Sequence, residues 1–150
     1  MLKEVDIKSG RLTYGQRIEL GKILGSKDSE VEMFEKALKC MYDIDVKPKH
    51  YKKYLGVFQN IVDGIVHWVK LESENLRYDP TPEEKRAGIE KLANDIGEFG
   101  TVKALASRFN VDPDEIFKWQ YGKVYGILAT DLKEYKYQTK LNNIINEKYK

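Results

Sequence analysis

The residue types that most often carry catalysis are few in this chain and do not form catalytic motifs. His50 and His67 stand far apart, and no Cys, Asp or Glu lies beside either at the HExxH or CxxC spacings that hold zinc. Neither histidine has a nucleophile as a partner in the sequence. Cys40 falls on the apolar side of a helical pattern, which favours a buried structural thiol over a nucleophile. The sequence therefore predicts no catalytic site, no metal site and no enzymatic activity.

Paired acids are a second candidate for chemistry, because two carboxylates can divide acid and base roles. The pairs Glu83-Glu84 and Asp114-Glu115 both fall in predicted first helical turns, where the helix dipole already accounts for them. The glycines are scattered singly and form no phosphate-binding or dinucleotide-binding loop. We therefore expect no cofactor.

One basic stretch could contact a polyanion, since cations neutralise phosphates and aromatic rings stack on bases. Its candidate residues are Lys47, Lys49, Tyr51, Lys52 and Lys53. The alternative is that these lysines are the solvated face of a helix start. Both interpretations stay open from sequence alone.

Composition narrows the class of protein. The chain has 150 residues, 26 Lys and Arg against 24 Asp and Glu, and a net charge of +2, which gives no general attraction for nucleic acid or anionic membranes. This length predicts one domain, residues 1–150, with a secondary division into 1–78 and 79–150 as an alternative. The charged N-terminus, the lone cysteine and the lack of a long apolar run predict a cytoplasmic protein without a membrane span.

Residues 102–121 resemble a helix-turn-helix. Ala106 stands where two helices must touch, and Asn110 precedes the predicted bend. The positions predicted to face inward are Leu105, Phe109, Ile116 and Trp119.

The start of the second helix in this segment argues against DNA reading. Asp112 is the expected N-cap, Pro113 the first helical residue, and Glu115 the reciprocal member of a capping box. With Asp114 these acids stand where a DNA reader would approach phosphates, and they would repel a duplex. Nucleic acid is therefore a disfavoured partner, although the packing pattern keeps a DNA-binding regulator as an alternative.

The remaining chain is punctuated by helix signals. We predict helices over 13–24, 29–43 and 51–76, preceded by an extended segment over the first ten residues. The long helix carries the apolar series Tyr51, Tyr54, Leu55, Phe58, Ile61, Val62, Ile65, Trp68 and Val69 and is predicted to lie in the core.

A fourth helix is predicted from Thr81, with Pro82 at its first position. We expect Gly97 and Gly100 to end it and Thr101 to cap the next helix. Its residues Leu92, Ile96 and Phe99 are predicted to face inward. After Pro113 the helical pattern continues towards Ile145, with the part after Tyr135 partly off the core.

Together these patterns predict an all-α fold, a compact bundle of six or seven helices that contains the helix-turn-helix-like pair. Aromatic residues in the last third exceed what one core needs, which makes them candidate protein-binding residues, unless all of them pack internally. They are Phe117, Tyr121, Tyr125, Tyr135 and Tyr137.

Three segments carry a resemblance: LTYGQRIELGKIL near the start, FEKALKCMY in the second helix, and KWQYGKVYGILATDLKEYKYQTKL near the end. They resemble small helical proteins of the structural gene blocks of tailed bacteriophages and prophages. Among these, the tail assembly chaperones have a similar helix start, present here as Thr13, Gly15 and Gln16.

This resemblance implies a non-enzymatic assembly protein that binds long helical phage proteins, such as the tape measure protein, in the bacterial cytoplasm. A virion structural protein, either connector or accessory, is a further alternative. A second copy of the chain is an additional candidate partner.

Overall fold

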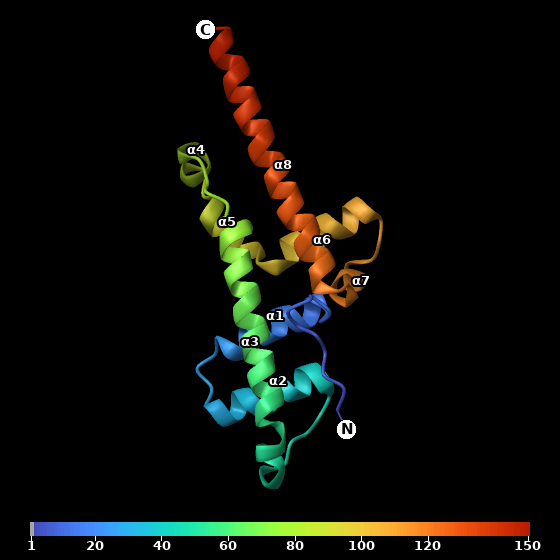
Figure 1. The fold of residues 1–150 in the computed structure, drawn as a ribbon. Helices are drawn as coiled ribbons and strands as arrows, with labels where there is room; N and C mark the ends of the chain where they lie inside the picture. Colours follow the sequence, from blue (N-terminus) through green and yellow to red (C-terminus); the bar gives the residue numbers. More distant parts are fainter. Residues whose placement is uncertain (1) are drawn as a thin grey trace.

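In the computed structural model, which describes residues 2–150, eight α-helices and one 3₁₀ turn follow one another, without a β-strand in that range (Figure 1). The all-α prediction with its helix-turn-helix-like pair is confirmed. The helices number eight rather than six or seven because two predicted helices are interrupted. The elements are α1 (Tyr14–Leu24), α2 (Glu30–Tyr42), η1 (Pro48–His50), α3 (Tyr51–Asn75), α4 (Pro82–Arg86), α5 (Ile89–Ile96), α6 (Glu98–Phe109), α7 (Pro113–Lys118) and α8 (Tyr121–Lys148).

Three helix starts form as predicted. Thr13, Ser29 and Thr81 each accept a hydrogen bond from the backbone N–H three residues later. The side chains at those later positions return a hydrogen bond to the cap backbone, which completes three capping boxes. The sequence places these boundaries correctly because each cap satisfies backbone donors locally.

Helices α1, α2, α3, α6 and α7 and the first part of α8 pack around one apolar core. Helices α1 and α2 lie across one part of α3, and α7 packs against α1. The second half of α8 extends away from the rest of the molecule (Figure 1). The fully buried large side chains are Leu12, Leu20, Leu38, Ile61, Val102, Ile116 and Val124.

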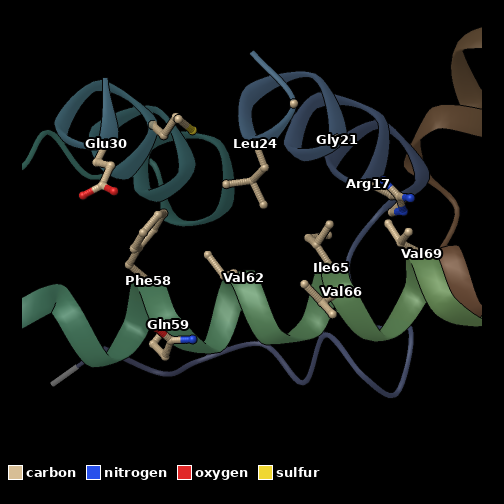
Figure 2. Close-up of a pocket in the computed structure, with 12 residues that line it drawn as sticks. Arg17, Gly21, Leu24, Glu30, Phe58, Gln59, Val62, Ile65, Val66 and Val69 are labelled. Atoms are coloured by element: carbon tan, nitrogen blue, oxygen red, sulfur yellow. The ribbon is translucent and has the colours of Figure 1, made fainter. Parts of the chain in front are cut away.

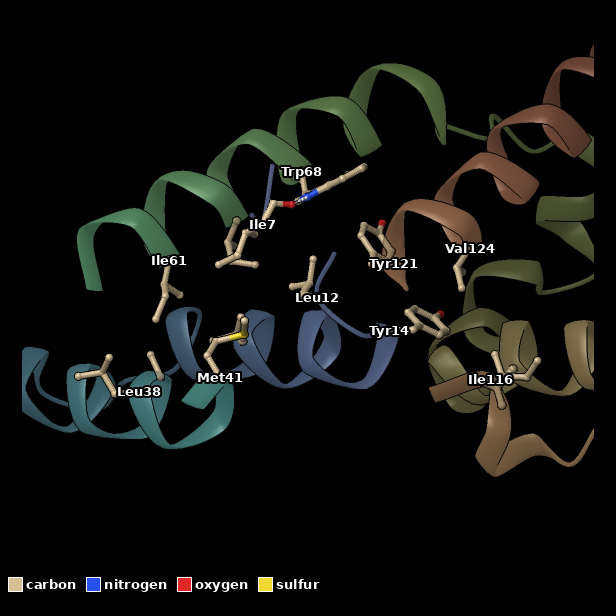
Figure 3. Packing of buried hydrophobic residues seen from close by; sticks show 14 of the residues in the cluster. Ile7, Leu12, Tyr14, Leu38, Met41, Ile61, Trp68, Ile116, Tyr121 and Val124 are labelled. Atoms are coloured by element: carbon tan, nitrogen blue, oxygen red, sulfur yellow. Dashed lines mark hydrogen bonds between the residues drawn. The ribbon is translucent and has the colours of Figure 1, made fainter. Parts of the chain in front are cut away.

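The first ten residues are more than an extended segment, because they fill the space between α3 and α8. Ile7 and Leu12 are buried, and the backbone oxygen of Ile7 accepts a hydrogen bond from Trp68 Nε1 at 2.6 Å (Figure 3). Trp68 also lies edge-on to Tyr121, with ring centroids 4.9 Å apart. We call Ile7, Leu12, Trp68 and Tyr121 the packed junction.

A charged side chain borders the packed junction. Glu72 accepts hydrogen bonds from Arg17 Nε at 2.8 Å and Nη2 at 2.7 Å, and from the Tyr121 hydroxyl at 2.6 Å. Burial, and then the hydrogen bond to Glu72, raise the pKa of Tyr121. The Tyr121 hydroxyl therefore stays a proton donor at neutral pH, and it joins α8 to α3.

The helix predicted from Thr81 is shorter than expected, and the apolar residues predicted to face inward are exposed. Gly88 adopts a φ of 87°, which ends α4 and starts α5. Gly97 then separates α5 from α6, which begins at Glu98, so that Gly100 and Thr101 lie inside α6 instead of between two helices. We call α4 and α5 the arm.

The pattern after Pro113 is also interrupted. Trp119 and Gln120 are extended, so α7 ends at Lys118 and α8 begins at Tyr121. The interruption has a tertiary cause, because the Trp119 carbonyl accepts from the Tyr14 N–H at 2.8 Å and the Tyr121 N–H donates to the Leu12 carbonyl at 2.7 Å. These bonds replace the helical ladder that the local sequence would otherwise continue.

Candidate docking groove

A groove of about 830 Å³ lies between α3 and the α1–α2 pair (Figure 2). We call it the docking groove. Its volume lies within the range of about 300–1,000 Å³ that ligand pockets occupy. Its lining residues are Arg17, Gly21, Leu24, Gly25, Glu30, Met33, Phe58, Gln59, Val62, Ile65, Val66 and Val69.

The floor of the docking groove is a row of valines on α3. Val62, Val66 and Val69 recur at spacings of four and three residues, which places them on one helix face. Val66 is 62% exposed and Val69 is also exposed. The opposite wall includes Leu24, while Gly21 contributes no side chain. The groove is therefore apolar along its length and open to solvent.

Charged groups lie at the two ends of the docking groove. Glu30 stands above Phe58 at one end, and Arg17 stands above Val69 at the other (Figure 2). Arg17 is already paired with Glu72, whereas Glu30 is exposed. Neither His nor Cys lines the groove. This arrangement suits apolar contact with an elongated partner better than acid-base chemistry.

A second apolar surface lies on the arm and its continuation. The residues predicted to face inward, Leu92, Ile96 and Phe99, are instead exposed, with 57% of Leu92 and 56% of Phe99 accessible. The prediction was wrong because a helical stripe shows only that a helix is amphipathic, and here no other element covers the stripe. With Ile89 these residues make a four-residue stripe, which we call the arm stripe.

The candidate aromatic residues do not gather on one surface. Tyr121 is 3% exposed and belongs to the packed junction, so its prediction as a surface residue is wrong. Phe117 and Tyr125 are half-buried, with Phe117 stacked near Tyr14 and the Tyr125 hydroxyl accepting from Asn75 at 2.9 Å. Tyr135 and Tyr137 are exposed on the projecting half of α8.

The helix-turn-helix-like pair packs largely as predicted. Leu105, Ala106 and Ile116 are buried, but Phe109 is 40% exposed and lies edge-on to the half-buried Trp119. Phe109 reaches only the rim of the core because Asn110 ends α6 in a left-handed turn directly after it.

The tip of α7 is acidic and exposed. Asp112 caps it by accepting from the Asp114 N–H at 2.8 Å, while the Glu115 carboxylate pairs with Lys118 at 3.2 Å. The predicted capping box at Glu115 is therefore wrong. Since α7 has only six residues and packs against α1, its surface offers little for a DNA groove.

The basic stretch remains a set of exposed lysines at the start of α3. Lys47, Lys49, Lys52 and Lys53 are exposed. The half-buried Tyr51 donates a hydrogen bond to Glu35 and packs edge-on against Phe34. Tyr51 is thus engaged with α2, whereas the half-buried Tyr54 has Lys53 Nζ 5.4 Å from its ring centroid, so polyanion binding by this stretch stays a prediction.

The remaining chemical candidates are dispersed. Cys40 is half-buried, and burial raises the pKa of its thiol to about 11, which disfavours the reactive thiolate. His50 is exposed at the start of α3, and His67 lies against the Trp68 ring. Within residues 2–150, no three His, Cys, Asp or Glu side chains converge as metal ligands.

No protein-family model, curated protein or solved structure matches this chain. None of the helices over residues 2–150 combines the length and apolar character needed to cross a membrane. The docking groove, the arm stripe and the exposed part of α8 are the surfaces of this chain that could contact a partner.

The docking groove was missed by the sequence prediction, which placed the whole apolar series of α3 in the core. Leu55 and Val69 of that series are exposed, as is Val66 beside it. The available signal was an excess of apolar positions, since Ile61, Ile65 and Trp68 already supply one buried stripe.

Proposed function

We propose that this protein is a non-enzymatic binder of α-helical protein segments. The observation that carries the proposal is the docking groove, whose apolar floor consists of the half-buried Val62 and the exposed Val66 and Val69. An amphipathic helix that lies along α3 would remove these valines from water, and no hydrogen bond or ion pair would have to break for this.

The groove has a framework suited to this role. Its floor belongs to the 25-residue helix α3, which Ile61 and Trp68 anchor in the core. Because core packing already fixes this floor, it loses little conformational freedom on binding, which favours affinity.

The resemblance of the LTYGQRIELGKIL segment supports a phage-type setting for this binding. In that setting the client is a long helical protein that must stay soluble in the bacterial cytoplasm until assembly. Retention in the particle as a virion structural protein would use the same groove. The acidic tip of α7 favours either role over DNA reading, because Asp112, Asp114 and Glu115 repel phosphates.

A synthetic peptide tests the proposal directly. The probe is an amphipathic helix of about 16 residues with leucines at i, i+3, i+4 and i+7 spacing, labelled for fluorescence anisotropy. We expect saturable binding, weakened at least about tenfold by Val66→Glu, because the new carboxylate would be desolvated.

The matched control is Val31→Glu. Val31 is 50% exposed on α2 and does not line the groove, so this change adds the same charge at a similar exposure. We expect Val31→Glu to bind the peptide as the unchanged protein does. Equal losses for both variants, or no saturable binding at all, would contradict the proposed function.

A further inference from the structure

The projecting half of α8 concentrates the positive charge of the chain. Residues 133–150 contain five lysines and two glutamates, although the whole chain has a net charge of only +2. All five lysines are exposed, and this half of α8 extends away from the core (Figure 1). The excess cations therefore gather at one end of the molecule, where they attract a polyanion locally even though the whole chain does not.

A hollow of about 440 Å³ lies between this half of α8 and the segment that precedes α4. We call it the α8 cleft. Aromatic rings, lysines and small polar side chains line it together, among them Tyr78, Tyr135, Lys136, Thr139, Lys140 and Asn143. The members from α8 recur at intervals of three and four residues, so they share one helix face.

Two tyrosine rings are held in place at the inner end of the α8 cleft. The Tyr78 hydroxyl donates to both carboxylate oxygens of Glu84 at 2.6 Å, and the Tyr78 and Tyr135 rings lie edge-on with centroids 5.8 Å apart. Both side chains are nevertheless partly open to solvent. Such rings stack on unpaired bases of any sequence, and a ring already held in place loses little freedom on binding.

Lys136 and Lys140 line the α8 cleft directly beyond Tyr135. They are one turn apart, about 6 Å along the helix axis at about 1.5 Å per residue. Thr139 and Asn143 add a hydroxyl and an amide that can hydrogen-bond to phosphates or base edges. Proteins that bind single strands use this combination, in which cations follow the phosphate backbone and rings stack on the bases.

The carboxylates near the α8 cleft leave its lysines effective. Asp79 lines the cleft but is paired with Arg77 at 3.1 Å. Glu147 lies at the outer end, about 10 Å along the helix axis from Lys140. Glu84 lines a different hollow.

The acidic tip of α7 is farther away, beside the start of α8 (Figure 1). From Tyr121 to Tyr135 the helix rises about 21 Å, which is twice the screening length of about 10 Å in 0.1 M salt. The acids that argue against DNA reading by α7 therefore do not oppose an anion in the α8 cleft.

We propose that the α8 cleft binds single-stranded nucleic acid, with phosphates at Lys136 and Lys140 and a base stacked on Tyr135. A duplex is a poorer fit, because its bases are paired and stacked on one another and leave the tyrosine rings no free base. An anionic membrane supplies phosphates but no bases. The α8 cleft is separate from the docking groove, so this inference does not depend on the proposed function.

Fluorescence anisotropy on the full chain tests the site with a labelled oligothymidylate of about 12 nucleotides in about 50 mM salt. We expect saturable binding that the double change Lys136→Gln and Lys140→Gln weakens at least about tenfold. Loss of two phosphate contacts should also make the slope of log K against log salt shallower by about 1.4.

The matched control is the double change Lys52→Gln and Lys53→Gln. It removes the same charge from exposed lysines at the start of α3, and it should leave the affinity and the salt slope unchanged. Glu147→Gln, by contrast, should tighten binding about twofold, because it removes a negative charge from the lining of the α8 cleft.

Tyr135→Leu separates base stacking from charge. We expect it to weaken oligothymidylate binding at least about fivefold and to leave heparin binding unchanged, because heparin carries charge but no bases. Misfolding would weaken both. Equal losses for the two ligands would overturn the assignment of a base to Tyr135 and with it the inference.

The other outcomes that overturn the inference are distinct. They are no saturable oligothymidylate binding in about 50 mM salt, tighter binding of a duplex of the same length, equal losses for the two lysine pairs, or binding only to vesicles of phosphatidylserine and phosphatidylcholine. Val66→Glu should leave oligothymidylate binding unchanged, so failure at the α8 cleft leaves client binding in the docking groove standing.

Discussion

The packed junction and the arm show two outcomes of the same kind of helical pattern. At the junction, Trp68 is covered by the N-terminal segment and by α8, and its indole N–H is satisfied by Ile7. In the arm stripe, by contrast, Leu92 of α5 and Phe99 at the start of α6 stand in solvent. An apolar stripe therefore shows which face of a helix needs a partner, but distant parts of the chain decide whether that face is covered.

The largest effect is expected from Trp68→Ala. This change removes the indole from between Ile7 and Tyr121, opens a cavity, and leaves the Ile7 carbonyl with only the hydrogen bond from the Gly10 N–H, so we expect a loss of about 3–5 kcal/mol in the free energy of unfolding. Urea denaturation followed by circular dichroism measures it. The control Trp68→Phe keeps a ring in place and should lose less; equal losses would mean that the packing of the junction contributes little.

A smaller effect is expected from Gly64→Ala, and the chain offers a matched control on the same helix. A methyl group on Gly64 would come within 2.5 Å of Ile7 Cγ2, whereas one on Gly56 would meet nothing within 4 Å. We expect Gly64→Ala to destabilise the protein by about 1–3 kcal/mol through overpacking.

Gly56→Ala should instead stabilise it by up to about 1 kcal/mol through helix propensity. Thermal unfolding of the two variants side by side makes the comparison. Equal shifts in Tm would show that the N-terminal segment does not press against α3.

A pH dependence of intermediate size is expected from Cys40. Because burial raises the pKa of the folded thiol from 9.0 to about 11, the folded state keeps its proton where the unfolded state loses it. The contribution of Cys40 to stability is therefore full below pH 9.0 and is lost as the pH rises towards 11.

Urea denaturation at pH 8 and pH 10 should show that the unchanged protein loses up to about 1 kcal/mol more than Cys40→Ala, a value reduced by the partial exposure of the thiol. Parallel losses in the two proteins would mean that the thiol is as solvated when folded as when unfolded.

The smallest effect is expected from removing residues 142–150. All of these residues are exposed on the projecting end of α8. We expect the free energy of unfolding to change by less than about 0.5 kcal/mol, because no core contact is lost. A large loss in urea denaturation would show that the projecting end is stabilised in solution by contacts that the monomer lacks.

Local signals predicted the helix starts, and tertiary contacts explain the errors. The caps at Thr13, Ser29 and Thr81 could be read from sequence because each is completed within four residues. The break at Trp119 and Gln120 could not, since its cause is hydrogen bonding to Leu12 and Tyr14.

The candidate site was harder to predict than the fold. A groove is a space between helices, so it depends on how α1 and α2 cross α3, which periodicity does not specify. The exposed Tyr135 and Tyr137 were recognisable because the sequence around them is rich in Lys, Gln and Asn. Tyr121 was not, because its burial depends on Trp68 and on Glu72, far away in sequence.

The pairing of Thr13 with Gln120 has a consequence for the order in which the chain matures on the ribosome. The opening segment is synthesised first, but its hydrogen-bonding partners emerge from the exit tunnel only roughly a hundred residues later. Helices α1 to α3 can form early, yet Leu12 must wait for Tyr121 before its carbonyl is satisfied. Closure of this long loop is thus a late step of biogenesis, and a nascent chain stalled before Gln120 would expose its beginning to chaperones and proteases.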